Sequence, residues 1–174
     1  MRRLLIHHVL PVAFCLVPVG GAVLVFAAVP PDARNHYLER IRSSAIDWLI
    51  LGLGIVLFVV QSILTYRALQ WRGDGFDERP DPWLSHLAQT AEWFPLLGLI
   101  GTVAAILQTF SSIPVGAQPA ASEIINKYAP AITATGSGLF MALTNIMPTW
   151  VALLGRDLIR ALAGMGETAP RAKP

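Results

Sequence analysis

Residues 46–66 read IDWLILGLGIVLFVVQSILTY, and no charged residue lies between Asp47 and Arg67. A run of about 20 residues at 1.5 Å each covers the roughly 30 Å hydrocarbon core of a bilayer. Trp48 near one end and Tyr66 at the other are typical of the aromatic belts found at membrane interfaces. The stretch therefore predicts a transmembrane helix.

Three further hydrophobic runs flank this stretch, at residues 4–29, 93–113 and 129–154. Charged residues make up only 14% of the 174 residues, against about 25% in soluble domains, and they cluster between the runs. The sequence therefore predicts an all-α, polytopic protein of the lipid bilayer with about four transmembrane helices and no large soluble domain.

The first run, residues 4–29, has two interpretations. Pro11 and Pro18 interrupt it, which a transmembrane helix tolerates where neighbouring groups satisfy the freed carbonyls. Arg2 and Arg3 before it also fit a cleaved signal peptide, although the apolar part is longer than such peptides usually have. We expect the run to be retained as a transmembrane helix.

The runs divide the chain into four segments. Residues 1–69 are expected to form an N-terminal transmembrane helix pair, and residues 70–92 a short cytoplasmic linker with an amphipathic helix. Residues 93–155 form a second helix pair, and residues 156–174 extend its last helix into the cytoplasm and end in a disordered tail. Nine of the 13 Lys and Arg residues then lie on the side of the two termini, so both termini are expected in the cytoplasm.

Small and polar residues recur at steps of three and four in the last two runs, which places each set on one helix face. Such a face either packs two helices closely or lines a cavity that holds a partner helix, water or ions. An amide in mid-membrane normally faces protein or water, which favours the second interpretation slightly. The residues are Gly98, Thr102, Ala105 and Thr109 in the third run, and Thr135, Gly138, Ala142, Asn145 and Thr149 in the fourth.

The interiors of the second, third and fourth runs contain no titratable residue, because Asp47, Glu92 and Asp157 lie near the ends of the runs. A protein that conducts protons through a membrane needs a titratable group along the path. The chain therefore either conducts nothing or relies on a carboxylate from a partner.

Other function classes find little support. The net charge of +2 comes without a basic stripe, so nucleic-acid binding is not expected. The single cysteine, Cys15, has no second cysteine to pair with and no cluster of metal ligands around it. The chain also lacks a glycine-rich phosphate loop and a nucleophile beside a base. We expect no enzyme activity, no cofactor and no metal site.

Two short motifs are more specific. Residues 95–103, PLLGLIGTV, resemble the P-x-LGLLGTV motif in the first channel helix of ExbB and TolQ proteins. Residues 135–143, TGSGLFMAL, are similar to the T-x-x-GL-x-x-A pattern of their last helix. The order, the spacing and the short loop between the motifs also match, over roughly residues 91–155. The chain thus resembles the MotA/TolQ/ExbB family of ion-driven motor proteins.

The resemblance implies a homopentamer in the bacterial inner membrane, around two copies of a single-span partner of the ExbD, TolR or MotB type. That partner carries an essential Asp, and the flow of protons or sodium ions is coupled to mechanical work. By match to the motifs, Thr102 and Thr135 are the pore hydroxyls that face this Asp. Pro95 and Gly101 belong to the first motif, and Pro148 takes the place of a proline that occurs earlier in ExbB and TolQ proteins.

The chain also departs from the family pattern. Pro130 stands where ExbB and TolQ proteins commonly carry a Glu. Residues 70–92 and 156–174 are too short for the cytoplasmic domain by which flagellar relatives drive a rotor, so a flagellar stator is not expected. The competing hypothesis is a non-conducting membrane scaffold that uses the same small-residue faces only for packing.

Overall fold

The structure is a computed structural model that describes most of the chain. Arg2 and Arg3, on which the signal-peptide interpretation depends, and the predicted tail at 164–174 lie outside the described residues. The described ranges are 10–42, 44–72, 75–76, 78–113 and 120–163. Within them the elements are α2 (Leu10–Ala28), α3 (Pro31–Ile41), α4 (Ala45–Ala68), β1 (Trp71–Arg72), β2 (Gly75–Phe76), α5 (Asp81–Ala91), α6 (Trp93–Ser111) and α7 (Ala121–Ala163).

Four helical stretches are long and apolar enough to cross a membrane, namely Leu10–Ala28, Ala45–Ala68, Asp81–Ser111 and Glu123–Ala161. This confirms the predicted all-α fold with about four transmembrane helices, and the only strands in the described ranges form a two-residue antiparallel pair. Only 11% of the first stretch is buried, against 50% of the last. Helix α2 therefore exposes most of its apolar surface, as a lipid-facing helix does, whereas α7 is enclosed by the others.

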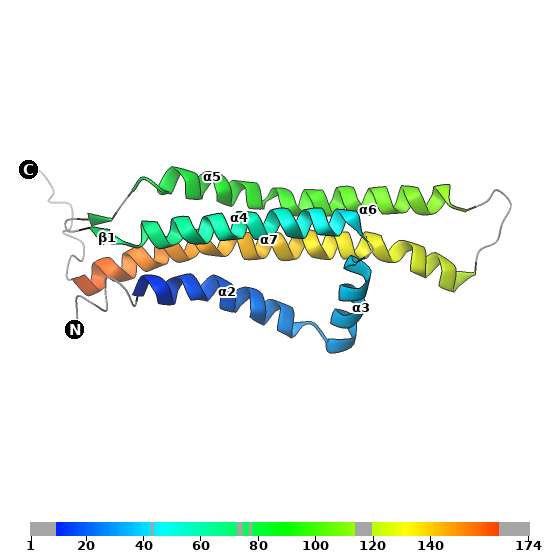
Figure 1. The fold of residues 1–174 in the computed structure, drawn as a ribbon, viewed down its shortest axis with the longest axis horizontal. Helices are drawn as coiled ribbons and strands as arrows, with labels where there is room; N and C mark the ends of the chain where they lie inside the picture. Colours follow the sequence, from blue (N-terminus) through cyan, green and yellow to red (C-terminus); the bar gives the residue numbers. More distant parts are fainter. Residues whose placement is uncertain (1–9, 43, 73–74, 77, 114–119, 164–174) are drawn as a thin grey trace, which may run out of the picture.

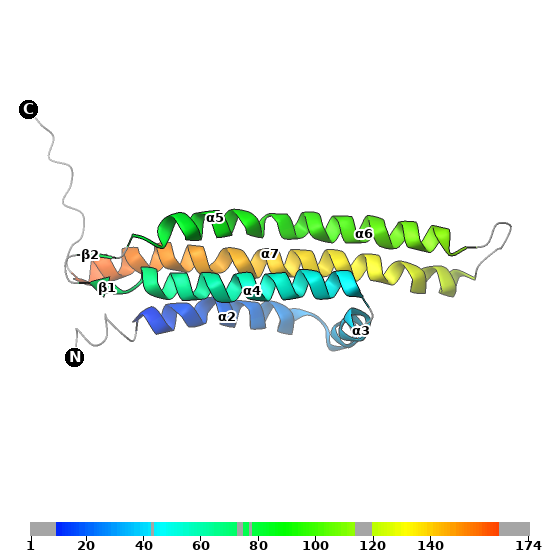
Figure 2. The ribbon, with the colours of Figure 1, turned by 45° about the horizontal axis from the view of Figure 1, so that its top comes forward.

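Helix α7 runs through the centre of the bundle, and all the other described helices contact it (Figures 1 and 2). Its 43 residues extend about 65 Å, roughly twice the hydrocarbon thickness of a bilayer. The helix begins before the predicted run at 129–154 and continues beyond it. Helix α2 begins and α7 ends at the same end of the bundle (Figure 1). The membrane-spanning part of α7 is thus extended by polar turns at both ends.

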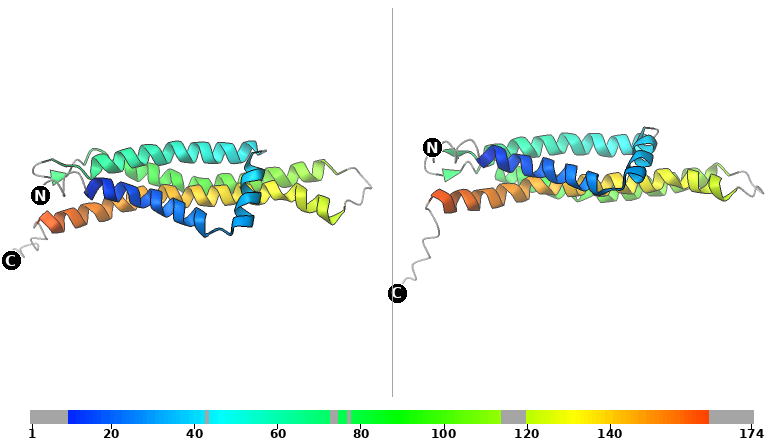
Figure 3. Two further views of the ribbon diagram at one scale, coloured as in Figure 1. Left: turned by 60° about the horizontal axis from the view of Figure 1, so that its bottom comes forward. Right: turned by 90° about the horizontal axis from the view of Figure 1, so that it is seen from below.

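Helix α3 was not foreseen from the sequence, which assigned no structure to residues 30–45. It lies across one end of α2 and α4, at a steep angle to the bundle (Figures 1 and 3). Pro31 opens it, Asp32 is in its first turn and Arg40 in its last, which is the charge order that favours a short helix. These local signals could have predicted the helix, but the segment is too polar to be recognised as a membrane span.

Pro130 explains one contact between α3 and α7. Because proline has no N–H, the carbonyl of Asn126, four residues earlier, loses its usual helical partner. The guanidinium of Arg40 donates to this carbonyl at 3.4 Å and to the side-chain oxygen of Asn126 at 3.2 Å. The outer turns of α7 therefore obtain from α3 a hydrogen bond that their own helix cannot supply.

Glycines bring α6 and α7 into backbone contact. A Cβ added to Gly138 would lie 2.5 Å from the carbonyl oxygen of Phe94 and 3.1 Å from the Cα of Gly98. A Cβ on Gly98 would lie 2.9 Å from the carbonyl oxygen of Ala134. Transmembrane helices that expose small residues to each other pack at such short range. The glycines of both predicted faces therefore hold α6 and α7 together.

We predict that Gly138→Ala forces α6 away from α7 and lowers the melting temperature of the purified protein. The new methyl group meets backbone atoms of α6, which cannot rotate away as a side chain would. Circular dichroism during heating of the detergent-solubilised protein measures the effect. Gly52→Ala is the matched control, because its Cβ meets nothing within 4 Å and alanine favours the helix. Equal melting temperatures for the two variants would contradict the close backbone contact.

Candidate functional site

Two threonine hydroxyls meet between α6 and α7. The Oγ1 atoms of Thr102 and Thr135 lie 2.5 Å apart. The Thr102 hydroxyl is also 2.9 Å from the carbonyl oxygen of Gly98 and 3.2 Å from that of Ala131. Each hydroxyl has one proton and two lone pairs, so the pair can satisfy itself and still accept a hydrogen bond from a further group. Both side chains are partly exposed, so a group outside the subunit can reach them.

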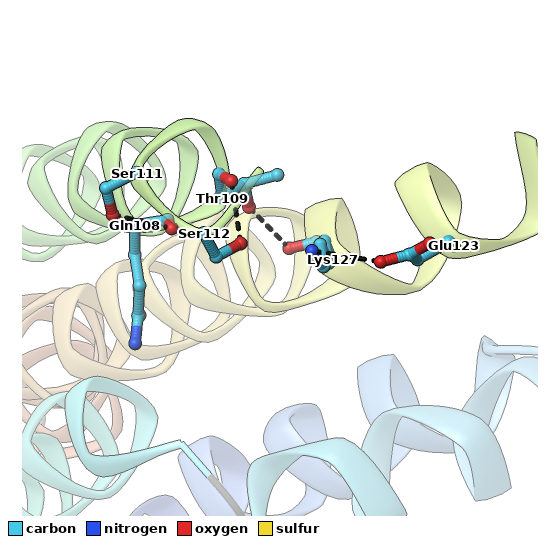
Figure 4. A network of polar contacts seen from close by, with 6 residues as sticks. All are labelled: Gln108, Thr109, Ser111, Ser112, Glu123 and Lys127. Carbon is cyan, nitrogen blue, oxygen red and sulfur yellow. Dashed lines mark hydrogen bonds and ion pairs between the residues drawn. The ribbon is translucent and has the colours of Figure 1, made fainter. Parts of the chain in front are cut away.

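Thr109, on the same predicted face of α6, also contacts α7. The Thr109 hydroxyl is buried and lies 2.9 Å from the carbonyl oxygen of Ala105 and 3.0 Å from that of Lys127 on α7 (Figure 4). Lys127 itself forms an ion pair with Glu123, one turn earlier on α7. Gly98, Thr102 and Thr109 therefore all contact the α7 backbone, and these contacts join the two helices at three levels.

The predicted face on α7 does not stay on one side of the subunit. Thr135 and Gly138 contact α6, and Ala142 belongs to a cluster with Ile50 of α4 and Phe94 of α6. The hydroxyl of Thr149 is 3.4 Å from a carbonyl oxygen of α5. A repeat of 3.5 residues drifts by only about 20° per heptad on a straight α-helix, so the change of partner follows mainly from the number of helices around α7.

Asn145 is fully buried and faces α4. Its Nδ2 donates to the carbonyl of Gly54 at 3.2 Å and to that of Met141 at 2.8 Å. Its Oδ1 accepts from the Nε2 of Gln61 at 3.3 Å. The amide thus faces protein, as a mid-membrane amide should, but the protein it faces is a helix of its own subunit. The structure therefore separates Asn145 from the Thr102–Thr135 pair.

The surroundings of the motif residues Pro95, Gly101 and Pro148 give each of them a part in helix structure or helix packing. Pro95 is in the first turn of α6, where a missing N–H costs no helical hydrogen bond. A Cβ on Gly101 would lie 2.8 Å from the Cβ of Ala134 and 2.9 Å from the Cγ2 of Ile46, so this glycine lets three helices meet. Pro148 lies within α7, and its carbonyl accepts from a threonine hydroxyl of α4 at 3.0 Å.

The burial of Asp47 and its contacts with α7 were not predicted from the sequence. It is fully buried, and its carboxylate accepts from the hydroxyls of Thr133 at 2.9 Å and Ser137 at 2.5 Å. The backbone N–H of Asp47 donates to the hydroxyl of Ser44, which caps α4. Ser44 and Asp47 therefore have the spacing of a local capping pair, which hides a long-range role. Thr133 and Ser137, one turn apart on α7, were the signal that could have revealed it.

The described residues contain no group of three or more His, Cys, Asp or Glu side chains that could hold a metal ion. Among the described residues, the buried polar groups are hydroxyls, the amides of Gln61 and Asn145, the carboxylate of Asp47 and the guanidinium of Arg156. Such groups can orient helices and exchange hydrogen bonds with a partner.

One comparison with known proteins gave a match. The model of the MotA/TolQ/ExbB proton channel family matches residues 60–169, which is more than half of the chain and includes all of α5, α6 and α7. Comparisons with curated proteins and with solved structures gave no significant match.

We predict that Asn145→Leu destabilises the protein more than Gln61→Leu. The first change leaves the amide nitrogen of Gln61 without its acceptor, whereas the second removes an Oε1 that is buried with no partner in the described structure. Interhelical hydrogen bonds in membranes contribute about 0.6 kcal/mol on average, so the coupling should be of that order. A double-mutant cycle on the unfolding free energy in mixed micelles measures it. A larger loss for Gln61→Leu would contradict the assigned contact.

Proposed function

The chain belongs to the MotA/TolQ/ExbB proton channel family, and we propose that it is the channel-forming subunit of a motor complex in the bacterial inner membrane. In this proposal five copies surround two copies of a single-span partner of the ExbD, TolR or MotB type. Protons or sodium ions flow between this subunit and an Asp of the partner, and the flow is coupled to mechanical work. The subunit itself is a multi-pass membrane protein of a channel family.

The observation that carries the proposal is the Thr102–Thr135 pair. The two hydroxyls come from the two motifs, touch each other and keep partly exposed side chains. A hydroxyl donates to an ionised carboxylate and accepts from a protonated one, so the pair suits both states of a partner Asp. A fixed cation at this point would favour only the ionised state.

The free energy of a hydrogen bond to a partner carboxylate is similar to the free energy that one ion releases on crossing the membrane. A hydrogen bond to a charged group contributes about 1.5–3 kcal/mol. One charge that crosses a potential of 100 mV releases about 2.3 kcal/mol. The driving force can therefore break a contact between the hydroxyl pair and a carboxylate, and the contact does not trap the partner in one position.

The distribution of charge supports an orientation with both termini in the cytoplasm. Arg67, Arg156 and Arg160 lie at the end of the bundle where α2 begins and α7 ends (Figure 1). Cytoplasmic ends of membrane helices carry an excess of Lys and Arg. In this orientation α3, with Arg34 and Arg40, lies on the outer side, and α5 leads from the cytoplasm into α6.

A membrane scaffold remains the second candidate, because two observations favour it. The α6 and α7 faces are in backbone contact at Gly98 and Gly138, and the Asn145 amide is used within the subunit. Both features serve packing. The scaffold gives no reason, however, for a pair of hydroxyls at two partly exposed residues, Thr102 and Thr135.

We predict that Thr135→Ala and Thr102→Val abolish most ion uptake and leave assembly with the partner intact. Each change removes a hydroxyl and little volume. Potential-driven uptake of protons, or of radioactive sodium, into proteoliposomes that contain the purified complex measures the effect. Thr144→Ala is the matched control, since the Thr144 hydroxyl bonds only to carbonyls of its own helix. Unchanged uptake in both variants would remove the pore role of these hydroxyls.

We predict that the chain, co-expressed with a neighbouring-gene product that has one Asp-bearing transmembrane helix, purifies as a complex of fixed stoichiometry. Native mass spectrometry should show five copies of this chain with two of the partner. A monomer, or an assembly without the partner, would favour the scaffold over the channel.

A further inference from the structure

Asp47 is buried at a point where three helices meet. Its carboxylate, from α4, accepts from Thr133 and Ser137 on α7, and the hydroxyl of Tyr37 on α3 lies 2.6 Å from that of Ser137. The proposed ion exchange does not involve Asp47, since Thr135 and Thr102 meet on the other side of α7. The buried carboxylate therefore requires a separate explanation.

Stability alone does not supply that explanation. A buried carboxylate costs free energy unless it is paired, and among the described residues Asp47 has two hydroxyl donors and no ion pair. An apolar side chain of similar size would pack at this position without that cost. Unlike an apolar side chain, however, the carboxylate fixes the orientation of the hydroxyls that it binds, because hydrogen bonds weaken steeply away from their preferred geometry.

The spacing of Thr133, Thr135 and Ser137 along α7 links the contacts of Asp47 to the orientation of Thr135. An α-helix turns by about 100° per residue, so Thr133 and Ser137 lie on one face, about 40° apart. Thr135 is two residues from each and therefore lies on the opposite face, about 160° away. Any contact that holds Thr133 and Ser137 against α4 consequently turns Thr135 toward α6.

Contacts on both sides of α7 bear on this rotation. On the α6 side, Gly98 and Gly138 permit close approach, and the hydroxyl of Thr102 reaches α7 only when Thr135 faces α6. Tyr37 reinforces the α4 side. Burial raises the pKa of its phenol, which the hydrogen bond with Ser137 only partly offsets, so the hydroxyl keeps its proton at neutral pH.

We propose that Asp47 is a positioning residue that sets the rotation of α7 about its own axis and so aims Thr135 at Thr102. The importance of this rotation for ion flow rests on the proposed function, but the rotation itself does not. Asp47→Leu removes both hydrogen bonds to α7. Asp47→Asn keeps them, because its amide accepts at one atom and donates at the other, and a hydroxyl can do either.

Disulfide trapping tests the rotation without any measurement of ion flow. Thr102→Cys and Thr135→Cys, in a full-length Cys15→Ser background, place two thiols where the hydroxyls meet. Oxidation in isolated membranes should cross-link them efficiently with Asp47 or with Asp47→Asn, and severalfold less with Asp47→Leu. Ile50→Ala is the control: it is a fully buried residue one turn along α4, and its loss weakens packing without removing a hydrogen bond.

The outcomes separate the hypotheses. Cross-linking in Asp47→Leu equal to the parent, or an equal fall in Ile50→Ala, would overturn the positioning role whatever the ion uptake shows. If Asp47→Leu does not accumulate in the membrane, Thr133→Val and Ser137→Ala each remove one hydrogen bond to Asp47, the latter together with the Tyr37 contact, and should each lower the cross-linking yield. With native threonines, Asp47→Leu should lower ion uptake and Asp47→Asn should restore it. Absence of uptake in the parent complex would remove the proposed function and leave the cross-linking result standing.

Discussion

The contact between the backbones of α6 and α7 is the constraint on which the rest of the bundle depends. Because Gly98 and Gly138 face each other with no side chain between them, the hydroxyls of Thr102 and Thr109 reach carbonyls of the opposite helix. A larger residue at either glycine would move these hydroxyls out of range. The same contact uses one face of α7 completely, so α2, α3, α4 and α5 must pack on what remains of its surface.

Residues that the sequence pattern places on one stripe of α7 contact different helices in the structure. Asn145 and Thr135 belong to the same heptad-like series, yet one bonds to α4 and the other to α6. Their separation follows from the number of neighbours around α7, to which a drift of about 20° per heptad adds little. A stripe of small and polar residues in a central helix therefore marks several interfaces.

The sequence was sufficient to predict the spans and to single out Thr102 and Thr135, although not that their hydroxyls touch each other. Both follow from local signals, which are charge-free runs of membrane length and two motifs of recognised order. The packing of helix α3 against α7 and the burial of Asp47 could not be predicted in the same way. Each depends on which surface of α7 is free, and that is decided only when the helices pack. A carboxylate at the start of a helix looks like a cap until a distant pair of hydroxyls is placed beside it.

The central position of α7 also bears on when the bundle can pack during synthesis of the chain. Helix α2 contacts α7 more extensively than it contacts α4, its nearest transmembrane neighbour in sequence. Since α7 is the last of these helices to leave the ribosome, α2 and α3 spend most of synthesis without their main partner. The spans α2 and α4 must therefore be stable in lipid before α7 is made, and their long runs of exposed apolar side chains suit that state. Packing of the bundle is consequently a late event, which requires α7.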